Sequence, residues 1–354
     1  MNDELRELWH HEAVEICTPQ TDHDFVNAGG TVDLDDGRVM LIYAGPVNVH
    51  GQAPGASRVY GRISEDGCKT WGQEREIIHH PECQAAGGTP LRAEDGTVWI
   101  FYLGFYASVW EDDQPNMDKT RSDLWAVRST DEGATVGDRQ VIFRGYTGAT
   151  NDAVELSTGR LVVPFSYLVT DPGRLVSVCV VSDDGGKTWR QGASIDIGQH
   201  GDHAGALEPV VQELRDGRLW MLIRTNLGYF MQSFSDDGGL TWEEPQKTQF
   251  ESPSSPCHLT RLQSGRLAII WNNTMQTTGI RSSFHMALSE DDGETWTDPV
   301  EVLRAQEDDY PQVSYPYIGE HRPGVMTVSC KHVQQGWNIV RPVVFQVPED
   351  ALLK

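Results

Sequence analysis

Polar side chains that could bind a ligand or move protons gather next to the β-rich stretches of this chain. Histidine changes its charge near neutral pH and can act as a general acid, and carboxylates and amides can bind hydroxyl groups. Residues of these types precede or end several stretches: Asp22, Asp24, Asn151, Asp152, His200, Asp202, His203, His258, Asn272 and Asn273. Their positions at the ends of these stretches predict a polar site at one end of the fold.

The most concentrated group is the loop segment His200-Gly201-Asp202-His203. An H-x-x-H spacing could hold a metal ion, but in a loop it is a weak signal. Contact with substrate or hydrogen bonding within the loop is favoured, so the sequence predicts no metal and no cofactor. Six of the polar residues are expected to contact substrate: Asp24, Asn151, Asp152, His203, His258 and Asn272.

Charge and composition exclude several classes of partner. The chain has 354 residues, and 52 acidic against 28 basic residues give a net charge of −24. Nucleic acids and anionic membranes need a basic stripe, which this sequence lacks. No apolar run approaches the roughly 20 residues that a membrane helix needs, and the acidic start is unlike a secretory signal. We therefore expect a cytoplasmic protein without a nucleic-acid or membrane partner.

The six cysteines lie far apart, and no two form a C-x-x-C pair. That spacing argues against a zinc site and, in a cytoplasmic protein of this size, against a disulfide framework. The sequence predicts free and mostly buried thiols.

One eight-residue pattern recurs along the chain. Full copies begin at Ser64, Ser182, Ser235 and Ser289, and a copy at Ser129 lacks the final tryptophan. The aspartate in each copy can accept backbone N–H groups, the glycine allows a positive φ, and the tryptophan can pack between neighbouring units. We expect these octets to be structural, not catalytic.

A second turn signal alternates with the octets. It places a glycine between two β-rich runs, at Gly37, Gly96, Gly159, Gly217, Gly265 and Gly324. The repeating unit has about 55 residues and contains two strands joined by this turn, a third strand, an octet and a fourth strand. Such a unit is typical of a propeller blade.

The six units predict an all-β fold, a six-bladed β-propeller of four-stranded antiparallel blades. We expect one domain over residues 1–354, with residues 1–20 as an N-terminal strap and a last blade closed by both chain ends. The blades are expected to begin near residues 25, 86, 149, 206, 257 and 313.

The octet resembles the Asp box, or bacterial neuraminidase repeat, and five copies along six blades are similar to the sialidase superfamily over roughly residues 20–345. The resemblance implies that the inner strands line a channel, with the active site at one mouth and the octets at the other. It also implies a tyrosine nucleophile, a glutamate base, an aspartate general acid and three arginines that hold the substrate carboxylate. A neutral phenol suits an anionic substrate because it does not repel it.

Residues 208–224 resemble the hairpin of the fourth blade in this superfamily. The resemblance makes Glu208 the base that takes the phenolic proton and Arg224 a bidentate ligand of the substrate carboxylate. The structural alternative is an ion pair between these two strand-end residues.

The resemblance also assigns Arg281, eight residues before the octet at Ser289, as a second arginine of the carboxylate site. It assigns Tyr315, at the start of the last inner strand, as the nucleophile, with Tyr310 and Tyr317 as rivals. A surface arginine and a channel-lining tyrosine are the structural alternatives.

Two expected residues of the superfamily pattern are missing. The first inner strand, residues 24–32, contains no arginine, and the loop over residues 44–57 contains no carboxylate. His50 is the titratable group in that loop and is our candidate general acid. The irregular segment over residues 110–121 is expected to be a lid beside the site.

The resemblance implies an exo-glycoside hydrolase that releases a terminal acidic sugar, such as a sialic acid, a related nonulosonic acid or a uronic acid, from an oligosaccharide or glycoconjugate. The same fold also hosts polysaccharide lyases and glycan-binding propellers without activity, so these remain alternatives. The sequence indicates no oligomeric state.

Overall fold

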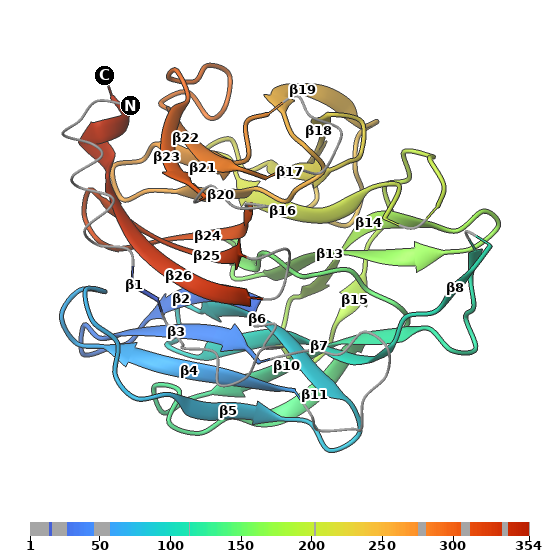
Figure 1. Ribbon diagram of the computed structural model, residues 1–354, viewed down its shortest axis with the longest axis horizontal. Helices are drawn as coiled ribbons and strands as arrows, with labels where there is room; N and C mark the ends of the chain where they lie inside the picture. The colour runs from blue at the N-terminus through green and yellow to red at the C-terminus, as the bar shows by residue number, and fades with distance from the viewer. Residues whose placement is uncertain are drawn as a thin grey trace.

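The computed structural model describes residues 14–15, 27–45, 57–112, 114–201, 203–274, 281–305, 312–334 and 339–353. Within these ranges the strands form six four-stranded antiparallel sheets, arranged as the blades of a propeller (Figure 1). The predicted fold class is confirmed. In this described part, no helix is long and apolar enough to cross a membrane.

The strands of the first three blades run in order from the inner strand outward. Blade one contains β2 (Asn27–Asp33), β3 (Val39–Ala44), β4 (Arg58–Ser64) and β5 (Arg75–His79). Blade two contains β6 (Gln84–Arg92), β7 (Val98–Ala107), β10 (Arg121–Ser129) and β11 (Gly137–Phe143). Blade three contains β12 (Val154–Glu155), β13 (Leu161–Val169), β14 (Arg174–Ser182) and β15 (Arg190–Gln191).

The other three blades have the same order. Blade four contains β16 (Leu207–Glu213), β17 (Leu219–Arg224), β18 (Tyr229–Ser235) and β19 (Gln246–Glu251). Blade five contains β20 (His258–Arg261), β21 (Leu267–Trp271), β22 (Ser283–Ser289) and β23 (Val300–Arg304). Blade six contains β24 (Gln312–Arg322), β25 (Val325–Gln334), β26 (Ile339–Pro348) and β1 (Val14–Glu15). A small hairpin, β8 (Trp110–Glu111) and β9 (Gln114–Pro115), extends from blade two, and a 3₁₀ turn spans Glu349–Leu352.

The two ends of the chain close the ring. The short strand β1 pairs with β26 through Val14 and Val344, so a segment near the start of the chain completes the last blade. The inner strand β2 also contacts all three of β24, β25 and β26. In Figure 1 the red strands of blade six accordingly lie beside the blue strands of blade one. The prediction that both chain ends build the last blade is confirmed.

The octets form tight turns at the ends of the third strands. In blade three, both the backbone N–H and the hydroxyl of Thr188 donate to Asp184. Trp189 then packs edge-on against Trp99 and Phe101 of blade two, at ring separations of 6.0 and 5.8 Å. The expected structural role of this pattern is confirmed, because the carboxylate is used within its own turn.

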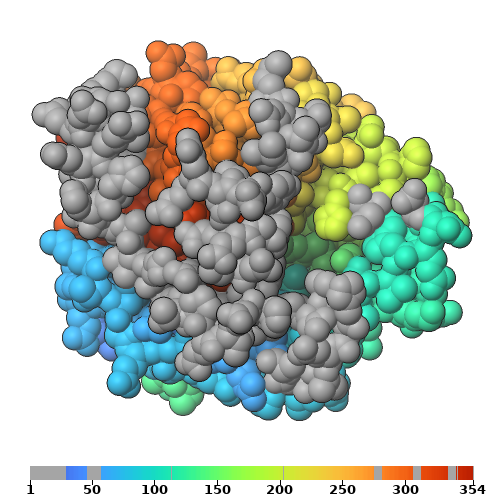
Figure 2. Space-filling view, in the orientation of Figure 1, coloured from blue at the N-terminus to red at the C-terminus, as the bar shows by residue number. Residues whose placement is uncertain are grey.

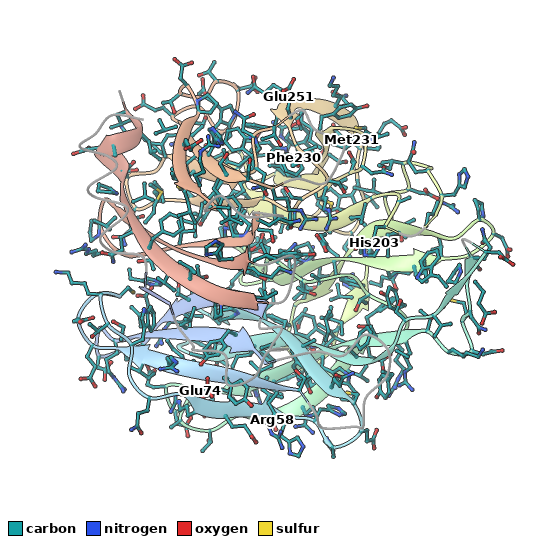
Figure 3. The ribbon with its side chains drawn as sticks, in the orientation of Figure 1. Arg58, Glu74, His203, Phe230, Met231 and Glu251 are labelled. Carbon is teal, nitrogen blue, oxygen red and sulfur yellow. The ribbon has the colours of Figure 1, made fainter. Side chains whose placement is uncertain are left out.

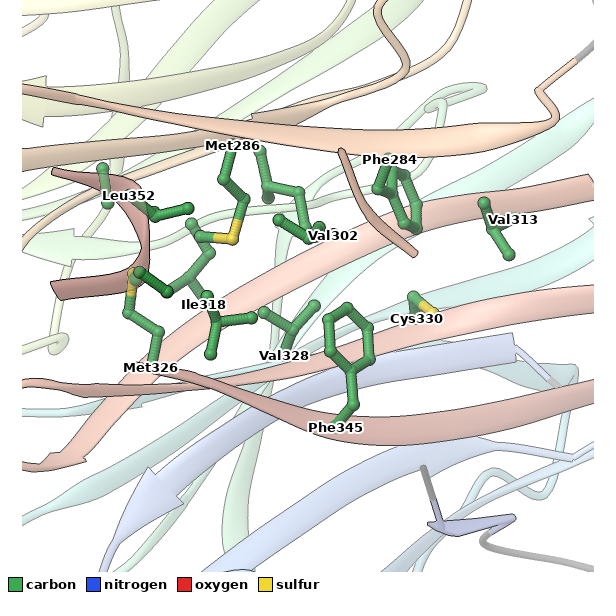
Figure 4. Packing of buried hydrophobic residues seen from close by; sticks show 14 of the residues in the cluster. Phe284, Met286, Val302, Val313, Ile318, Met326, Val328, Cys330, Phe345 and Leu352 are labelled. Atoms are coloured by element: carbon green, nitrogen blue, oxygen red, sulfur yellow. The ribbon is translucent and has the colours of Figure 1, made fainter. Parts of the chain in front are cut away.

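Apolar contacts between neighbouring blades fix the inner strands relative to one another. At the interface of blades five and six, Phe284 and Met286 pack against Val328 and Phe345 (Figure 4). The five cysteines in the described ranges are buried and free, as predicted: Cys68, Cys83, Cys179, Cys257 and Cys330.

Four inner strands share a bulge near their first residues, where two residues oppose one on the neighbouring strand. The register shifts fall between Ala28 and Thr31, Ala86 and Thr89, Leu207 and Val210, and Ser314 and Tyr317. The bulge residues are glycine pairs in blades one and two, Glu208-Pro209 in blade four and Tyr315-Pro316 in blade six.

The bulge determines the backbone conformation of two candidate catalytic residues. Gly87 has φ +71° in blade two, whereas Glu208 and Tyr315 have φ +39° and +54° at the corresponding positions. Such a conformation costs a non-glycine residue about 1–3 kcal/mol and is concentrated at functional sites. Because strands alternate in direction, this end of each blade is opposite to the octet turn.

Candidate active site

The phenol of Tyr315 and the carboxylate of Glu208 meet between blades six and four. The Tyr315 hydroxyl donates to Glu208 Oε1 at 2.9 Å, and only 7% of Glu208 is exposed. The Glu208 backbone N–H donates to the Ser166 hydroxyl at 3.2 Å, which fixes the bulge against blade three. The contact expected between these two residues is therefore present.

Two guanidinium groups converge beside this pair. Arg224 Nη1 donates to the second carboxylate oxygen of Glu208, and its Nη2 donates to the Ser254 hydroxyl at 3.3 Å. Arg281 Nη2 donates to the Ser254 carbonyl at 2.9 Å. The Nε atoms of both arginines are buried and have no hydrogen-bond partner in the described part of the chain. Ser254, which the sequence analysis did not identify, thus bridges two cations that retain unused donors.

The surroundings of Glu208 and Tyr315 shift the pKa values of these two groups in opposite directions. Burial alone would raise the pKa of Glu208, but the charge of Arg224 and the hydrogen bonds from Arg224 and Tyr315 bring that pKa below its ordinary value. Burial and the negative charge of Glu208 raise the pKa of Tyr315, and the two guanidinium groups only partly oppose this. The resting pair is a neutral phenol that faces an ionised acceptor, which is the arrangement needed for general-base activation.

A buried lysine completes the cluster. Lys331 on β25 is 3% exposed, and its Nζ lies 4.8 Å from the centre of the Tyr315 ring. Arg281 approaches the same ring at 5.8 Å. The sequence analysis missed this residue, although a single lysine within the apolar run of β25 is a recognisable signal.

Three of the predicted substrate-contact residues are buried near the axis. Asn151 is 1% exposed, and its Oδ1 lies 3.5 Å from the Tyr317 hydroxyl. Asp152 accepts the Val211 backbone N–H at 2.8 Å and so joins blade three to blade four. His258 packs against the Tyr317 ring and accepts the Ile318 backbone N–H at 3.3 Å.

The two remaining candidates have different environments. Asn272 is fully buried, and its amide donates to the carbonyls of Ser283 and Val313, which is a packing arrangement between blades five and six. His203 is exposed on the loop between blades three and four (Figure 3).

Several residues singled out from the sequence lie outside the described residues: Asp22, Asp24, His50, Asp202 and Tyr310. In the ranges that are described, no group of three or more His, Cys, Asp or Glu side chains could hold a metal ion.

The segment expected to be a lid contains the β8–β9 hairpin, in the teal region that projects at the right edge of the molecule in Figure 2. Its Trp110 packs against a small cluster of Leu168, Leu175 and Leu207. Leu207 directly precedes Glu208, so this hairpin supports the strand that carries the carboxylate.

Comparison with known proteins shows which family this chain matches. A family model described as a BNR repeat-like domain matches residues 58–328. The chain belongs to this family. The repeat-based prediction of a sialidase-superfamily propeller is thereby confirmed.

Among curated proteins, the chain is similar to a sialidase from Micromonospora viridifaciens, with 26% identity over 303 residues. The match covers 74% of this chain and 43% of that sialidase, so the chain spans less than half of its relative's length.

Among solved structures, the chain is similar to a protein of unknown function from Dyadobacter fermentans, with a TM-score of 0.73, 17% identity and coverage of 94% and 98% of the two chains. It is also similar to the NanB sialidase from Streptococcus pneumoniae, with a TM-score of 0.69, 13% identity and coverage of 99% and 73%. At these identities the structural matches establish the fold alone.

Proposed function

We propose that this protein is a sialidase-type glycoside hydrolase that removes a terminal acidic sugar from a glycan. The observation that carries the proposal is the buried hydrogen bond between Tyr315 and Glu208 beside the two guanidinium groups of Arg224 and Arg281. The similarity to sialidases supports the reaction class, and the site itself supports the charge of the substrate.

Charge balance favours an anionic substrate. Glu208 contributes one negative charge, whereas the buried Arg224 and the partly buried Arg281 contribute two positive charges. A carboxylate on the sugar would neutralise the excess. A neutral sugar would leave that excess uncompensated.

The proposed reaction proceeds in two displacements. Glu208 takes the phenolic proton while Tyr315 Oη attacks the anomeric carbon, the glycosidic C–O bond breaks, and a general acid protonates the leaving oxygen. Water then attacks the anomeric carbon and gives a proton to the conjugate base of the general acid, the bond to Tyr315 breaks, and Glu208 returns its proton to the phenolate. The sugar is released with retained configuration. His50 stays our candidate for the acid.

The test is a panel of aryl glycosides of N-acetylneuraminic acid, glucuronic acid and galactose, with NMR of the first-formed anomer. We expect turnover of an acidic glycoside with retention, and none of the galactoside. A polyuronate tested in parallel identifies a lyase, because elimination leaves an unsaturated product that absorbs in the ultraviolet. Lyase activity, binding of acidic sugars without turnover, or equal turnover of the galactoside would each overturn the proposal.

A further inference from the structure

Ser254 contacts both guanidinium groups of the candidate site through two different atoms. Its hydroxyl accepts a hydrogen bond from Arg224 Nη2 at 3.3 Å, and its backbone carbonyl accepts one from Arg281 Nη2 at 2.9 Å. Arg224 ends β17 in blade four, and Arg281 lies just before β22 in blade five. Ser254 lies between β19 and β20, in the segment that joins these two blades. One residue of a connecting segment therefore holds cations from two neighbouring blades.

The backbone of this segment is fixed on both sides of Ser254. The Ser252 backbone N–H donates to the Gly228 carbonyl at 3.0 Å, and the Ser252 hydroxyl donates to the Ser255 carbonyl at 3.2 Å. Ser252, Pro253 and Ser255 are buried, whereas Ser254 is partly exposed and has φ +51°. A residue other than glycine keeps such a conformation only where the surrounding structure enforces it, and such residues cluster at functional sites. The fold therefore presents Ser254 to the two arginines in one defined geometry.

The acceptor atoms of Ser254 are neutral, which separates its role from that of Glu208. Glu208 forms an ion pair with Arg224 and so offsets one positive charge. The hydroxyl and the carbonyl of Ser254 orient the guanidinium groups through their dipoles and leave the charge unchanged. Burial and the charge of Arg224 lower the pKa of Arg281, because the two cations lie close together. A serine can hold these like charges side by side without removing the charge on which an acidic ligand would act.

We propose that Ser254 is a positioning residue of the carboxylate site and sets the selectivity of that site for acidic ligands. Its hydroxyl and carbonyl hold Arg224 and Arg281 in the orientation in which both contact one ligand carboxylate, and its neutrality keeps the site cationic. This inference rests on the proposed function for the identity of the ligand. It deepens that function, because it names the residue that makes the site respond to ligand charge.

Four substitutions separate the hydroxyl, the backbone conformation and the charge. Ser254→Ala removes the hydroxyl, and Ser254→Gly also removes the cost of the positive φ. Ser254→Asn and Ser254→Asp introduce side chains of the same shape that differ in charge, and both residue types tolerate a positive φ. Thr158→Asp is the control for an added charge. Thr158 is exposed in the glycine turn of blade three, at the octet end, where other blades have Asp36, Asp95 and Asp216.

The first experiment measures Kd for N-acetylneuraminic acid and for its methyl ester, which is the same sugar without the charge. We expect Ser254→Asn to bind both ligands like wild type, within about threefold. Ser254→Asp should bind the acid at least about tenfold more weakly than Ser254→Asn does, and the ester equally well, because the new carboxylate competes with the ligand for Arg224. Thr158→Asp should bind like wild type. Equal affinity of the Asn and Asp variants for the acid, or equal losses for acid and ester in Ser254→Asp, would overturn the inference.

The second experiment measures kcat and KM for the acidic aryl glycoside, together with Tm. Ser254→Ala should raise KM about tenfold, the worth of a hydrogen bond to a charged group, and change kcat much less. The reason for the small change in kcat is that the hydrogen bond between Tyr315 and Glu208 does not include Ser254. Ser254→Gly should match the KM of Ser254→Ala and have at least the same Tm. A serine that only supports the loop would lower Tm without this split between KM and kcat, and an unchanged KM in Ser254→Ala would contradict the positioning role.

A sugar-independent readout separates this inference from the proposed function. If wild type binds no acidic sugar, the proposed function fails, and acetate serves as the minimal carboxylate probe. In protein with isotope-labelled arginine, Arg224→Lys and Arg281→Lys identify the NMR signals of the two Nε–H groups. These signals should shift with acetate in wild type and Ser254→Asn, and much less in Ser254→Asp. No response in wild type, or the same response in Ser254→Asp, overturns the inference.

Discussion

At the scale of single residues, the candidate site depends on the phenol of Tyr315. Its hydrogen-bond environment differs from that of Tyr317, two positions further along the chain. Tyr315 donates to Glu208 at 2.9 Å, whereas the Tyr317 hydroxyl lies 3.4 Å from the Thr150 carbonyl in a buried position. The bulge between them interrupts the alternation of the strand, so their proximity in sequence does not give them the same environment.

Replacement of Tyr315 by Phe removes the attacking oxygen and leaves the ring in place. We expect turnover of the acidic aryl glycoside to be lost and the free energy of unfolding to change by less than about 1.5 kcal/mol, the net worth of one hydrogen bond. The measurements are initial rates and denaturant unfolding. Tyr317→Phe is the control and should keep its activity. Full activity in Tyr315→Phe would rule out Tyr315 as the nucleophile.

Arg224→Lys keeps the charge but loses the planar fork. We expect KM for the acidic glycoside to rise about tenfold or more, because a lysine cannot hold Glu208, Ser254 and a substrate carboxylate together. Inhibition by a neutral sugar, if measurable, should change little. Equal losses for acidic and neutral ligands would instead indicate a general distortion of the site.

At the scale of elements, the bulge and the octet give the two ends of each blade different roles. The bulge turns a side chain toward the channel at the cost of an unfavourable φ, and the octet joins two outer strands with a carboxylate that is fully used by its own turn. We therefore expect activity and stability to depend on different aspartates and glutamates, although the chain is rich in both.

Two adjacent aspartates of one octet test whether the octet carboxylate serves stability and not activity. Asp184 accepts hydrogen bonds from Lys187 and Thr188 within its turn, whereas Asp183 forms exposed ion pairs with Arg160 and Arg190. We expect Asp184→Ala to destabilise the protein by roughly 1–3 kcal/mol and Asp183→Ala by less than about 1 kcal/mol. Thermal and denaturant unfolding measure both. Neither should change kcat, and a large loss of kcat in Asp184→Ala with the fold intact would contradict the structural role.

At the scale of the whole molecule, buried polar groups near the axis link one blade to the next. Asp152 is 6% exposed and accepts the Val211 N–H across the boundary of blades three and four. Burial raises the pKa of this carboxyl to about 7, against weaker opposing effects of the backbone N–H groups of Val211 and Ala153. The folded protein thus holds a proton that the unfolded chain releases near pH ~4.

The sign of the resulting pH dependence follows from that difference. Between about pH 4 and 7 the folded state binds more protons than the unfolded state, so the contribution of Asp152 to stability is lost as pH rises through this window. Asp152→Asn keeps an acceptor for the N–H and removes the charge. We expect the Asp152→Asn variant to have a higher Tm than wild type at pH 8, where its free energy of unfolding should be larger by roughly 2–4 kcal/mol. At pH 4 its Tm should be nearly unchanged.

The exposed Asp298 provides the control, because Asp298→Asn should have little effect at either pH. A Tm for Asp152→Asn that equals the wild-type value at pH 8 would mean that burial does not raise the pKa of the Asp152 carboxyl.

The fold could be predicted from the sequence alone, because the octets and the glycine turns are local signals. Asp184 finds its partners within four residues, and the turn at Gly217 joins strands that are adjacent in the chain, so each signal acts independently of the rest. The same regularity placed Glu208 and Tyr315 at equivalent ends of their blades, and the family resemblance suggested the contact that the structure contains.

The polar residues that surround this contact depend on the tertiary structure and could not be predicted. Ser254 and Lys331 join Arg224 and Arg281 through closure of the ring, which brings together segments from blades four, five and six. Conversely, Asn272 stands at a strand end like a site residue, yet its amide binds the carbonyls of neighbouring segments. A strand end has the same sequence pattern whether its side chain faces a ligand or a neighbouring blade, because burial and charge balance arise only when the blades assemble.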